Sequence, residues 1–242
     1  MPTSLVTGAS RGIGRAVALR LAFDGHDVAV GYGANAAAAE AVADEVRSMG
    51  RRAIAAGADL AEPDAAGALV DAVEAGLGPV DVLVANAGVN TPGRRVEEIE
   101  TEEWDRLHAV NLRAPFLLAR RVLPGMERRG FGRIVLLSSV AAYTGGIIGA
   151  HYASSKAGLH GLAHSLSQQA AGRGVTVNVV APAFIESDML PADPTVRAQL
   201  AESLPVGRLG TAEEVADLIA AVVRNGFVTN QSFLIDGGRH PT

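Results

Sequence analysis

Short hydrophobic runs rich in β-branched residues alternate along this chain with longer segments rich in Ala and Leu, in which polar and charged positions are interspersed. The short runs are typical of buried strands, and the longer segments are typical of helices. Seven strands are predicted, at residues 4–7, 28–30, 53–56, 80–85, 133–138, 175–180 and 233–235. Helices are predicted at residues 12–23, 36–49, 64–74, 101–126 with a bend near Pro115, 152–171 and 212–223.

Strands that alternate with helices in this way indicate βαβ units and a parallel sheet. The predicted fold is α/β, a single doubly wound sheet of about seven parallel strands with helices on both faces. No internal repeat or linker marks a boundary, so residues 1–242 are expected to form one domain. The stretch 181–205 interrupts the pattern with four prolines and one short predicted helix at 195–204. Long irregular segments are often functional, so a lid is expected around 183–205.

The composition excludes several other classes of protein. With 48% hydrophobic and 19% charged residues over 242 positions, the chain is expected to fold around a large core. A formal net charge of -5 argues against nucleic acid or an anionic membrane as a partner. The absence of cysteine excludes disulfides and cysteine-ligated metals. No signal pattern opens the chain and no apolar stretch approaches the ~20 residues that span a bilayer, so a cytoplasmic location is expected.

A glycine-rich turn follows the first predicted strand. It reads TGASRGIG at residues 7–14 and leads directly into the amphipathic helix at 12–23. Such a turn lets a pyrophosphate approach bare backbone, and the N-terminus of the following helix presents N–H groups to the anion. The sequence therefore predicts a Rossmann-type NAD(P)-binding domain, although the spacing G-x-x-x-G-x-G differs from the usual G-x-G-x-x-G pattern. The expected phosphate-binding residues are Gly8, Ser10, Arg11, Gly12, Ile13 and Gly14.

The end of the second predicted strand indicates which dinucleotide binds. NAD-binding domains usually place an acidic residue there to hold the ribose hydroxyls, whereas residues 30–35 read VGYGAN and contain no acid. Arg11 and Arg15 lie close by, on the loop and the first helical turn, where they can pair with a 2′-phosphate. NADP(H) is therefore favoured over NAD(H). For Arg15, an ordinary solvated surface charge is an equal alternative.

Tyr152 and Lys156 lie four residues apart at the start of the helix predicted at 152–171, which places them on one face. Lys156 is the only lysine among the 21 lysine and arginine residues of the chain. A stray surface lysine is one interpretation. The spacing from one of only three tyrosines favours a functional pair instead.

Together with the motifs between them, the glycine-rich turn and this pair resemble the short-chain dehydrogenase/reductase family over essentially the whole chain. The resemblance rests on the order and spacing of TGASRGIG at 7–14, GADL at 57–60, NAG at 86–88, Asn111, Ser139, Tyr152 and Lys156. Within the family the chain is most similar to 3-oxoacyl-[acyl-carrier-protein] reductases, in the segments GRIVLLSS, NVVAPAFIESDML and PVGRLGTAEEVAD.

By this resemblance, four residues form the catalytic set. Ser139 stabilises the developing alkoxide, Tyr152 donates the proton as general acid, Lys156 holds the nicotinamide ribose, and Asn111 supports a water that links the lysine to solvent. A hydrogen-bonding role inside a helix is the alternative for Asn111, and Ser138 is expected to be structural. The other implied cofactor contacts, beside the catalytic Tyr152 and Lys156, are Asp59, Leu60, Asn86, Ala87, Gly88, Pro182, Ile185 and Ser187.

The chemistry of the Tyr152–Lys156 pair can also be argued from charge. A tyrosine hydroxyl titrates near pH ~10 in water. A positive charge about 4 Å away, at an effective dielectric near 20, favours the phenolate by ~4 kcal/mol, or roughly three pK units. We therefore expect Lys156 to lower the pKa of Tyr152. A compact ammonium also binds two ribose hydroxyls from one point, for which a planar guanidinium needs a wider pocket.

Two positions depart from the family's usual pattern. Ala183 follows Pro182 where the family commonly has glycine, and its methyl group is expected to tighten the nicotinamide pocket or restrict the hinge of the lid. Ser187 stands where the family often has threonine near the carboxamide, and binding is expected to survive because the hydroxyl is kept. Asp59 is expected at the adenine amino group, with helix capping as the alternative.

The expected substrate pocket is apolar and has no cation for a carboxylate or phosphate, so a neutral carbonyl group is expected there. Its predicted lining is Ala141, Tyr143, Ile147, Ile148, His151, Phe184, Met189 and Leu190. The resemblance then implies an NADPH-dependent reductase of 3-oxoacyl thioesters. Another ketone, secondary alcohol or sugar is the main alternative substrate, and a non-catalytic NADP-binding regulator is a third possibility.

Further expectations concern partners and metals. Arg128, Arg129 and Arg173 form a candidate basic patch for an acidic acyl carrier protein, with solvated surface charge as the alternative. The resemblance implies a homo-oligomer, usually a tetramer. His160 and His164 lie one helical turn apart but have no third ligand, so no metal site is predicted.

Overall fold

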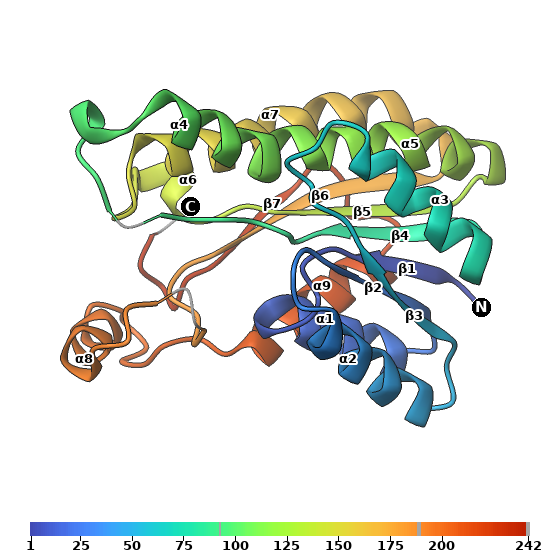
Figure 1. Ribbon diagram of the computed structural model, residues 1–242, viewed down its shortest axis with the longest axis horizontal. Helices are drawn as coiled ribbons and strands as arrows, with labels where there is room; N and C mark the ends of the chain where they lie inside the picture. The colour runs from blue at the N-terminus through green and yellow to red at the C-terminus, as the bar shows by residue number, and fades with distance from the viewer. Residues whose placement is uncertain (92, 188–189, 241–242) are drawn as a thin grey trace.

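The computed structural model describes residues 1–91, 93–187 and 190–240, and its centre is one parallel sheet (Figure 1). Seven strands join it in the order β3-β2-β1-β4-β5-β6-β7, and every neighbouring pair is parallel. The predicted doubly wound α/β fold is therefore confirmed. The strands are β1 (Thr3–Val6), β2 (Asp27–Tyr32), β3 (Ala53–Gly57), β4 (Val80–Ala85), β5 (Gly132–Leu137), β6 (Val175–Pro182) and β7 (Ser232–Ile235).

Helices cover both faces of the sheet (Figure 1). One face carries α1 (Gly12–Phe23), α2 (Ala36–Ser48) and α9 (Ala212–Arg224). The other carries α3 (Ala65–Leu77), α4 (Thr101–His108), α5 (Ala114–Arg129) and α7 (Ala150–Ala170). Shorter elements are η1 (Val96–Glu98), α6 (Ala141–Thr144), η3 (Ala171–Arg173) and α8 (Pro194–Glu202).

The sequence pattern of the central strands follows from this double cover. Every residue of β5 and β6 is buried, because helices pack on both sides of them. Arg133 in β5 is charged, and its guanidinium donates to the carbonyl oxygens of Val223 and Gly132 at 3.0 and 2.8 Å. Thr211 and Glu214 form a capping box that starts α9.

The helix predicted at 101–126 is interrupted. After α4 the chain forms a π-helical segment, η2 (Ala109–Arg113), and α5 then runs to Arg129. The predicted bend near Pro115 is therefore misplaced: Pro115 lies in the first turn of α5, where proline is tolerated. The distortion comes one turn earlier and contains Asn111. Single π turns are frequent at functional sites because they re-aim the residues they carry.

The irregular stretch after β6 leaves the sheet and returns to it. An isolated bridge pairs Ile185 with Gly210 at its two ends, and α8 lies between them. Although α8 is fully described, none of its residues is buried. Arg197 of α8 donates to the carbonyl oxygens of Pro191 and Ser187, at 2.8 and 3.0 Å. Met189, predicted to line the substrate pocket, lies outside the described residues.

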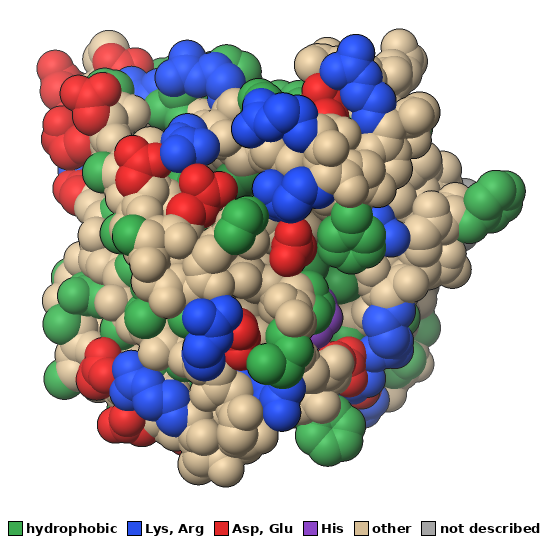
Figure 2. All heavy atoms as spheres, turned by 90° about the vertical axis from the view of Figure 1, so that its right-hand side faces the viewer, with side chains coloured by type: hydrophobic (Ala, Val, Ile, Leu, Met, Phe, Trp, Pro, Cys, Tyr) green, Lys and Arg blue, Asp and Glu red, His purple; other side chains and the backbone are tan. Residues whose placement is uncertain are grey.

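The face at the amino ends of the strands, seen in Figure 2, carries basic and acidic side chains interspersed with each other. The opposite edge, at the carboxyl ends of the strands, is where ligands bind in sheets of this kind, at the point where the strand order reverses between β1 and β4. Among the described helices, none combines the length and apolar character needed to cross a membrane.

Candidate active site

The glycine-rich turn after β1 needs its glycines for close packing. A Cβ on Gly14 would lie 2.2 Å from the carbonyl oxygen of Gly8, and a Cβ on Gly8 would lie 2.9 Å from the Cα of Ala87. Gly12 is different: it has φ +55°, and no atom of the described chain lies within 4 Å of the position its Cβ would take. Gly14 therefore lets the turn close on itself, and Gly8 lets it pack against Ala87. Gly12 leaves open space at the start of α1.

This open space suits an anion. Helix α1 begins here, its first turn has no acidic residue, and no side chain of the described residues caps it. Its first N–H groups are then available to a phosphate group, which the positive end of the helix dipole also favours. The residues present thus fit the pyrophosphate of a dinucleotide.

Asn86 fixes the shape of the turn from the end of β4. Its amide nitrogen Nδ2 donates to the carbonyl oxygens of Thr7 and Gly8, at 2.8 and 3.1 Å. In return, the Thr7 hydroxyl accepts from the backbone nitrogens of Asn86 and Ala87, at 3.1 and 3.0 Å. Asn86 therefore acts on the turn rather than pointing into the open space. Thr7 is the first residue of the TGASRGIG motif, and no role was predicted for it from the sequence.

Of the residues predicted around the adenosine end, Arg15 lies in α1, and Asp59 and Leu60 follow β3. Arg15 forms an ion pair with Glu45 of α2, at 2.6 Å between Nη2 and Oε2. Asp59 does not cap α3, because its carboxylate accepts from the backbone nitrogen of Ala61 and lies 3.7 Å from the Arg106 guanidinium. Leu60 beside it is buried. The capping alternative for Asp59 is thereby excluded.

Three consecutive residues at the end of β5 contact helix α7. The Lys156 ammonium donates to the carbonyl oxygen of Leu137 at 2.8 Å. The Ser138 hydroxyl donates to the carbonyl oxygen of Lys156 at 2.9 Å, and the Ser139 side chain lies close enough to the Tyr152 hydroxyl to lower its pKa. The structure thus brings Ser139, Tyr152 and Lys156 together, as the sequence predicted, and gives Ser138 the structural contact expected of it.

Burial sets the protonation of this pair. The side chains of Tyr152 and Lys156 are largely removed from solvent, at 7% and 4% exposure. Burial raises the pKa of the Tyr152 hydroxyl, and the hydrogen bond with Ser139 offsets only part of that rise. Burial also lowers the pKa of Lys156 to about 8. The predicted lowering of the Tyr152 pKa is therefore wrong: desolvation has the largest effect on the hydroxyl, and the Lys156 ammonium lies 5.8 Å from the ring centre.

Asn111 lies fully buried in the π-helical segment and ties it to the loop after β4. Its Oδ1 accepts from the backbone nitrogen of Val89 at 2.8 Å, and its Nδ2 donates to the carbonyl oxygen of Val89 at 3.0 Å. A Cβ on Gly88 would lie 3.3 Å from the Asn111 Oδ1 and 3.4 Å from the Lys156 Nζ. Asn111 thus makes the structural hydrogen bonds of the alternative interpretation, and it also lies beside Lys156.

The predicted substrate pocket is only partly assembled around Tyr152. Ala141 is buried and Ile148 packs against the Tyr152 cluster, whereas Tyr143 and Ile147 are exposed. The expectation that His151 lines the pocket is wrong, because its ring is fully buried. Nε2 of the ring lies 2.8 Å from the Thr91 hydroxyl and 3.3 Å from the Glu103 carboxylate.

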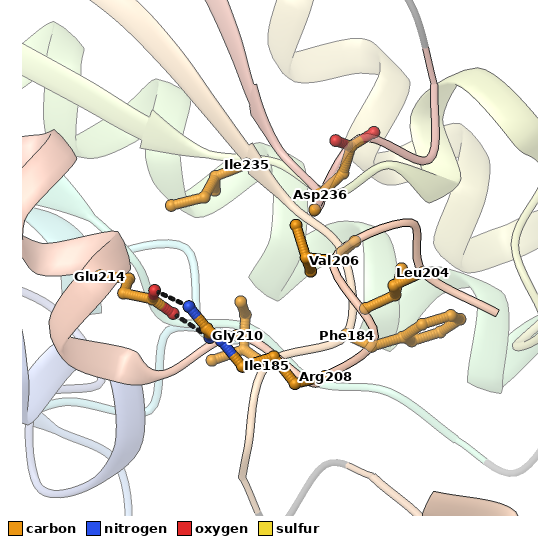
Figure 3. Close-up of a pocket in the computed structure, with 11 residues that line it drawn as sticks. Phe184, Ile185, Leu204, Val206, Arg208, Gly210, Glu214, Ile235 and Asp236 are labelled. Carbon is orange, nitrogen blue, oxygen red and sulfur yellow. Dashed lines mark hydrogen bonds and ion pairs between the residues drawn. The ribbon is translucent and has the colours of Figure 1, made fainter. Parts of the chain in front are cut away.

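Residues after β6 surround a separate cavity of about 180 Å³ (Figure 3). Phe184 and Ile185 line it together with Ile235, and it is closed toward α9 by the Arg208–Glu214 ion pair, whose guanidinium lowers the pKa of Glu214 to about 2. Phe184, which was predicted to line the substrate pocket, lines this cavity.

The remaining predicted cofactor contacts continue from the end of β6. Pro182 pairs with Ile235 of β7, and its carbonyl oxygen accepts from the backbone nitrogen of Val140 at 3.0 Å, next to Ser139. The Ser187 hydroxyl donates to the carbonyl oxygen of Ile185 at 3.1 Å. No group of three or more metal-ligating side chains occurs within residues 1–91, 93–187 and 190–240.

Comparisons with known proteins agree with this geometry. The family profile for short chain dehydrogenases matches residues 2–196. The 3-oxoacyl-[acyl-carrier-protein] reductase FabG of Staphylococcus aureus (strain Mu50 / ATCC 700699) is 37% identical over 241 residues, covering 98% of each chain. The enzyme of the same name from Escherichia coli (strain K12) is 37% identical over 98% of this chain and 96% of its own. A blue fluorescent protein from a metagenomic library, solved in complex with NADPH, superposes with a TM-score of 0.91 at 35% identity, covering 99% of this chain and 98% of its own.

Proposed function

The chain belongs to the short-chain dehydrogenase family and is an oxidoreductase acting on CH–OH and C=O groups, and we propose that it reduces 3-oxoacyl thioesters to 3-hydroxyacyl thioesters with NADPH. The observation that carries this proposal is the convergence of Ser139, Tyr152 and Lys156 where β5 meets α7. The names of the relatives from Staphylococcus aureus and Escherichia coli support the substrate class.

The proposed chemistry uses the protonation state that burial favours. NADPH, when bound, supplies the hydride that adds to the carbonyl carbon. Tyr152, whose raised pKa keeps the hydroxyl protonated at neutral pH, donates its proton to the carbonyl oxygen as the C–O single bond forms. The Ser139 hydroxyl donates a hydrogen bond to the same oxygen as it gains negative charge. Lys156 stabilises the phenolate that forms on Tyr152. Asn111 supports the water that links Lys156 to solvent, through which Tyr152 regains its proton.

The glycine-rich turn is the proposed cofactor site. The pyrophosphate would lie over Gly12, where the space is open, with Ser10, Arg11, Ile13 and Gly14 beside it. The names of the relatives say nothing of cofactor choice, but the NADPH complex of the structural neighbour supports the phosphorylated form. The absence of an acid at residues 32–35 supports a preference for NADP(H) over NAD(H). Asp59, Leu60, Ala87, Gly88, Pro182, Ile185 and Ser187 are proposed to complete the contacts.

Two arginines of the candidate carrier-protein patch are engaged in ion pairs. Arg129 is paired with Asp81 at 3.1 Å, and Arg173 is paired with Glu127 at 2.7 Å. Both lie at the end of α7 opposite Tyr152, ~30 Å away at 1.5 Å per helical residue. We therefore expect that Arg129→Glu and Arg173→Glu each keep kcat/KM for a carrier-bound substrate within about twofold of the wild type. A drop of tenfold or more would place the carrier on this patch. A homotetramer and a single domain over 1–242 are proposed from the resemblance.

The test of the proposed function is steady-state oxidation of NADPH by the purified protein with an acetoacetyl thioester. The loss of NADPH absorbance is followed, and the assay is repeated with NADH. We expect turnover that prefers NADPH. In Tyr152→Phe we expect kcat to fall at least 100-fold while NADPH fluorescence titration gives an unchanged dissociation constant. Binding of NADPH without turnover in the wild type would reject the thioester and favour another ketone or secondary alcohol. Turnover retained in Tyr152→Phe would reject the assigned proton donor.

A further inference from the structure

His160 lies on α7 one turn after Lys156, and the chemistry above does not use it. Its ring nevertheless contacts three other elements. Nε2 lies 2.9 Å from the Ser138 hydroxyl at the end of β5. Nδ1 lies 2.9 Å from the Ser232 hydroxyl of β7 and 3.3 Å from the Tyr143 hydroxyl of α6. A histidine is thus inserted between the catalytic strand and its neighbours.

The hydrogen atoms in this network can be assigned by elimination. The Ser138 hydroxyl donates its one proton to the carbonyl oxygen of Lys156 at 2.9 Å, so toward His160 it can only accept. Nε2 of His160 must then carry the proton, and Nδ1 is left as an acceptor for the Ser232 hydroxyl. Burial, assisted by the neighbouring His164, lowers the pKa of His160, which is consistent with this neutral form. Both ring nitrogens are therefore satisfied in a single tautomer.

The contact with Ser138 matters because of what lies on either side of it. The carbonyl oxygen of Leu137 accepts from the Lys156 ammonium at 2.8 Å, and the Ser139 side chain lies beside the Tyr152 hydroxyl and lowers its pKa. Ser138 has two links to α7, one to the Lys156 carbonyl and one to His160. The strand end is thus held against the helix at three successive residues, and His160 supplies the link that lies furthest along α7.

We propose that His160 is a positioning residue of the reductase: through Nε2 it fixes Ser138 and so keeps Ser139 aligned with Tyr152 and Lys156. This inference rests on the proposed function. Its second contact reaches the substrate side, since the Tyr143 ring meets the His160 ring edge-on at 5.0 Å between centroids and 81° between planes. The Nε2 contact fixes the end of β5, which carries Ser139. The Nδ1 contacts fix Ser232 of β7 and Tyr143 of α6.

Two substitutions separate these contacts. The amide nitrogen of glutamine reaches about as far as Nε2 of histidine, so His160→Gln can still donate to Ser138. The amide of asparagine reaches only as far as Nδ1, so His160→Asn keeps the side toward Ser232 and loses Ser138. A change of about 1 Å in a reacting group costs up to ~100-fold in rate. We expect kcat to fall about 10- to 100-fold in His160→Asn and His160→Leu, and to stay within about fivefold in His160→Gln.

The chain offers a matched control one turn further along α7. His164 bonds the Asn230 side chain at 2.6 Å and is exposed, so His164→Leu removes a histidine contact from the same helix without touching Ser138. We expect its kcat to match the wild type. Because the cofactor turn lies elsewhere, the dissociation constant for NADPH should stay within about twofold in all four variants, and thermal unfolding checks that each is folded.

The experiment is the acetoacetyl thioester assay on the folded variants. Equal losses in His160→Gln and His160→Asn, or a His160→Leu enzyme within twofold of wild type, would overturn the inference. If the wild type does not turn over this substrate, the proposed function fails first, and a second readout remains. Lys156 gives the only lysine side-chain signal in an NMR spectrum of protein labelled at the lysine ε carbon. Its titration midpoint should move in His160→Asn but not in His160→Gln or His164→Leu, and an unmoved midpoint in His160→Asn would also overturn the inference.

Discussion

Lys156 gives a prediction that separates stability from catalysis. Its side chain is 4% exposed, and burial lowers its pKa from 10.5 to about 8. At ~1.4 kcal/mol per pK unit, holding a charged ammonium in this site at neutral pH costs the folded protein about 3 kcal/mol. The hydrogen bond to the Leu137 carbonyl oxygen returns roughly 1 kcal/mol. A neutral side chain of similar length should therefore stabilise the fold while removing the proposed cation.

We predict that Lys156→Met raises the free energy of unfolding by about 2 kcal/mol at pH 7 and abolishes turnover. The sign follows from linkage, because the folded-state pKa lies below the unfolded one. Between about pH 8 and pH 10.5 the unfolded chain holds a proton on Lys156 that the folded chain has lost, so the wild type gains stability as the pH rises through this window. The advantage of the methionine variant should be full below pH 8 and gone by about pH 10.5.

Urea unfolding of both proteins at pH 7 and pH 10 measures this difference, with Arg128→Met as a control that removes an exposed cation from α5. The control should change the unfolding free energy by less than about 0.5 kcal/mol. A Lys156→Met protein that is no more stable than the wild type at pH 7 would refute the reasoning. It would mean that the ammonium keeps its hydration or finds further partners. The single lysine signal of ε-labelled protein gives the same answer directly, as a titration near pH 8.

Two further predictions concern the cofactor site. Gly14→Ala places a methyl group 2.2 Å from a backbone oxygen and should destabilise the fold by several kcal/mol. Gly12→Ala meets no described atom within 4 Å but strains a backbone with φ +55°, so it should cost only about 1–2 kcal/mol, remain folded and bind NADPH at least tenfold more weakly, as thermal unfolding and fluorescence titration would show. Glu45→Gln releases Arg15 from its ion pair and, at ~0.5–1 kcal/mol for an exposed pair, should lower the KM for NADPH about two- to fivefold and leave that for NADH unchanged; equal changes for both cofactors would contradict a role for Arg15 at the 2′-phosphate.

The elements that the sequence predicted correctly are those set by local pattern. The buried runs of β4, β5 and β6 have no alternative to a strand inside two helical layers. The spacing of Tyr152 and Lys156 needs only a regular helix to bring the two onto one face, and α7 is regular there. The local sequence alone is therefore sufficient to predict these features.

The features that were missed depend on contacts between distant segments. The π-helical segment around Asn111 is stabilised by hydrogen bonds to Val89 on another loop, so no signal near position 111 announces it. His151 follows the same logic: its place on the helix suggested a pocket, but Thr91 and Glu103 bind it from elsewhere in the chain. Polar side chains on a buried helix face can be recognised in a sequence, but their partners cannot.

The geometry around Lys156 explains why this position is lysine in a chain that otherwise uses arginine. The ammonium is buried, and among the described residues the acceptor it reaches is the carbonyl oxygen of Leu137; a Cβ on Gly88 would lie only 3.4 Å from Nζ. A guanidinium brings five N–H donors in a rigid plane, and most of them would be buried here without partners. Lysine brings fewer donors, and those left over can turn toward a bound ribose. The same closure that selects lysine lowers its pKa, so the proposed catalytic cation and the cost in stability have one cause.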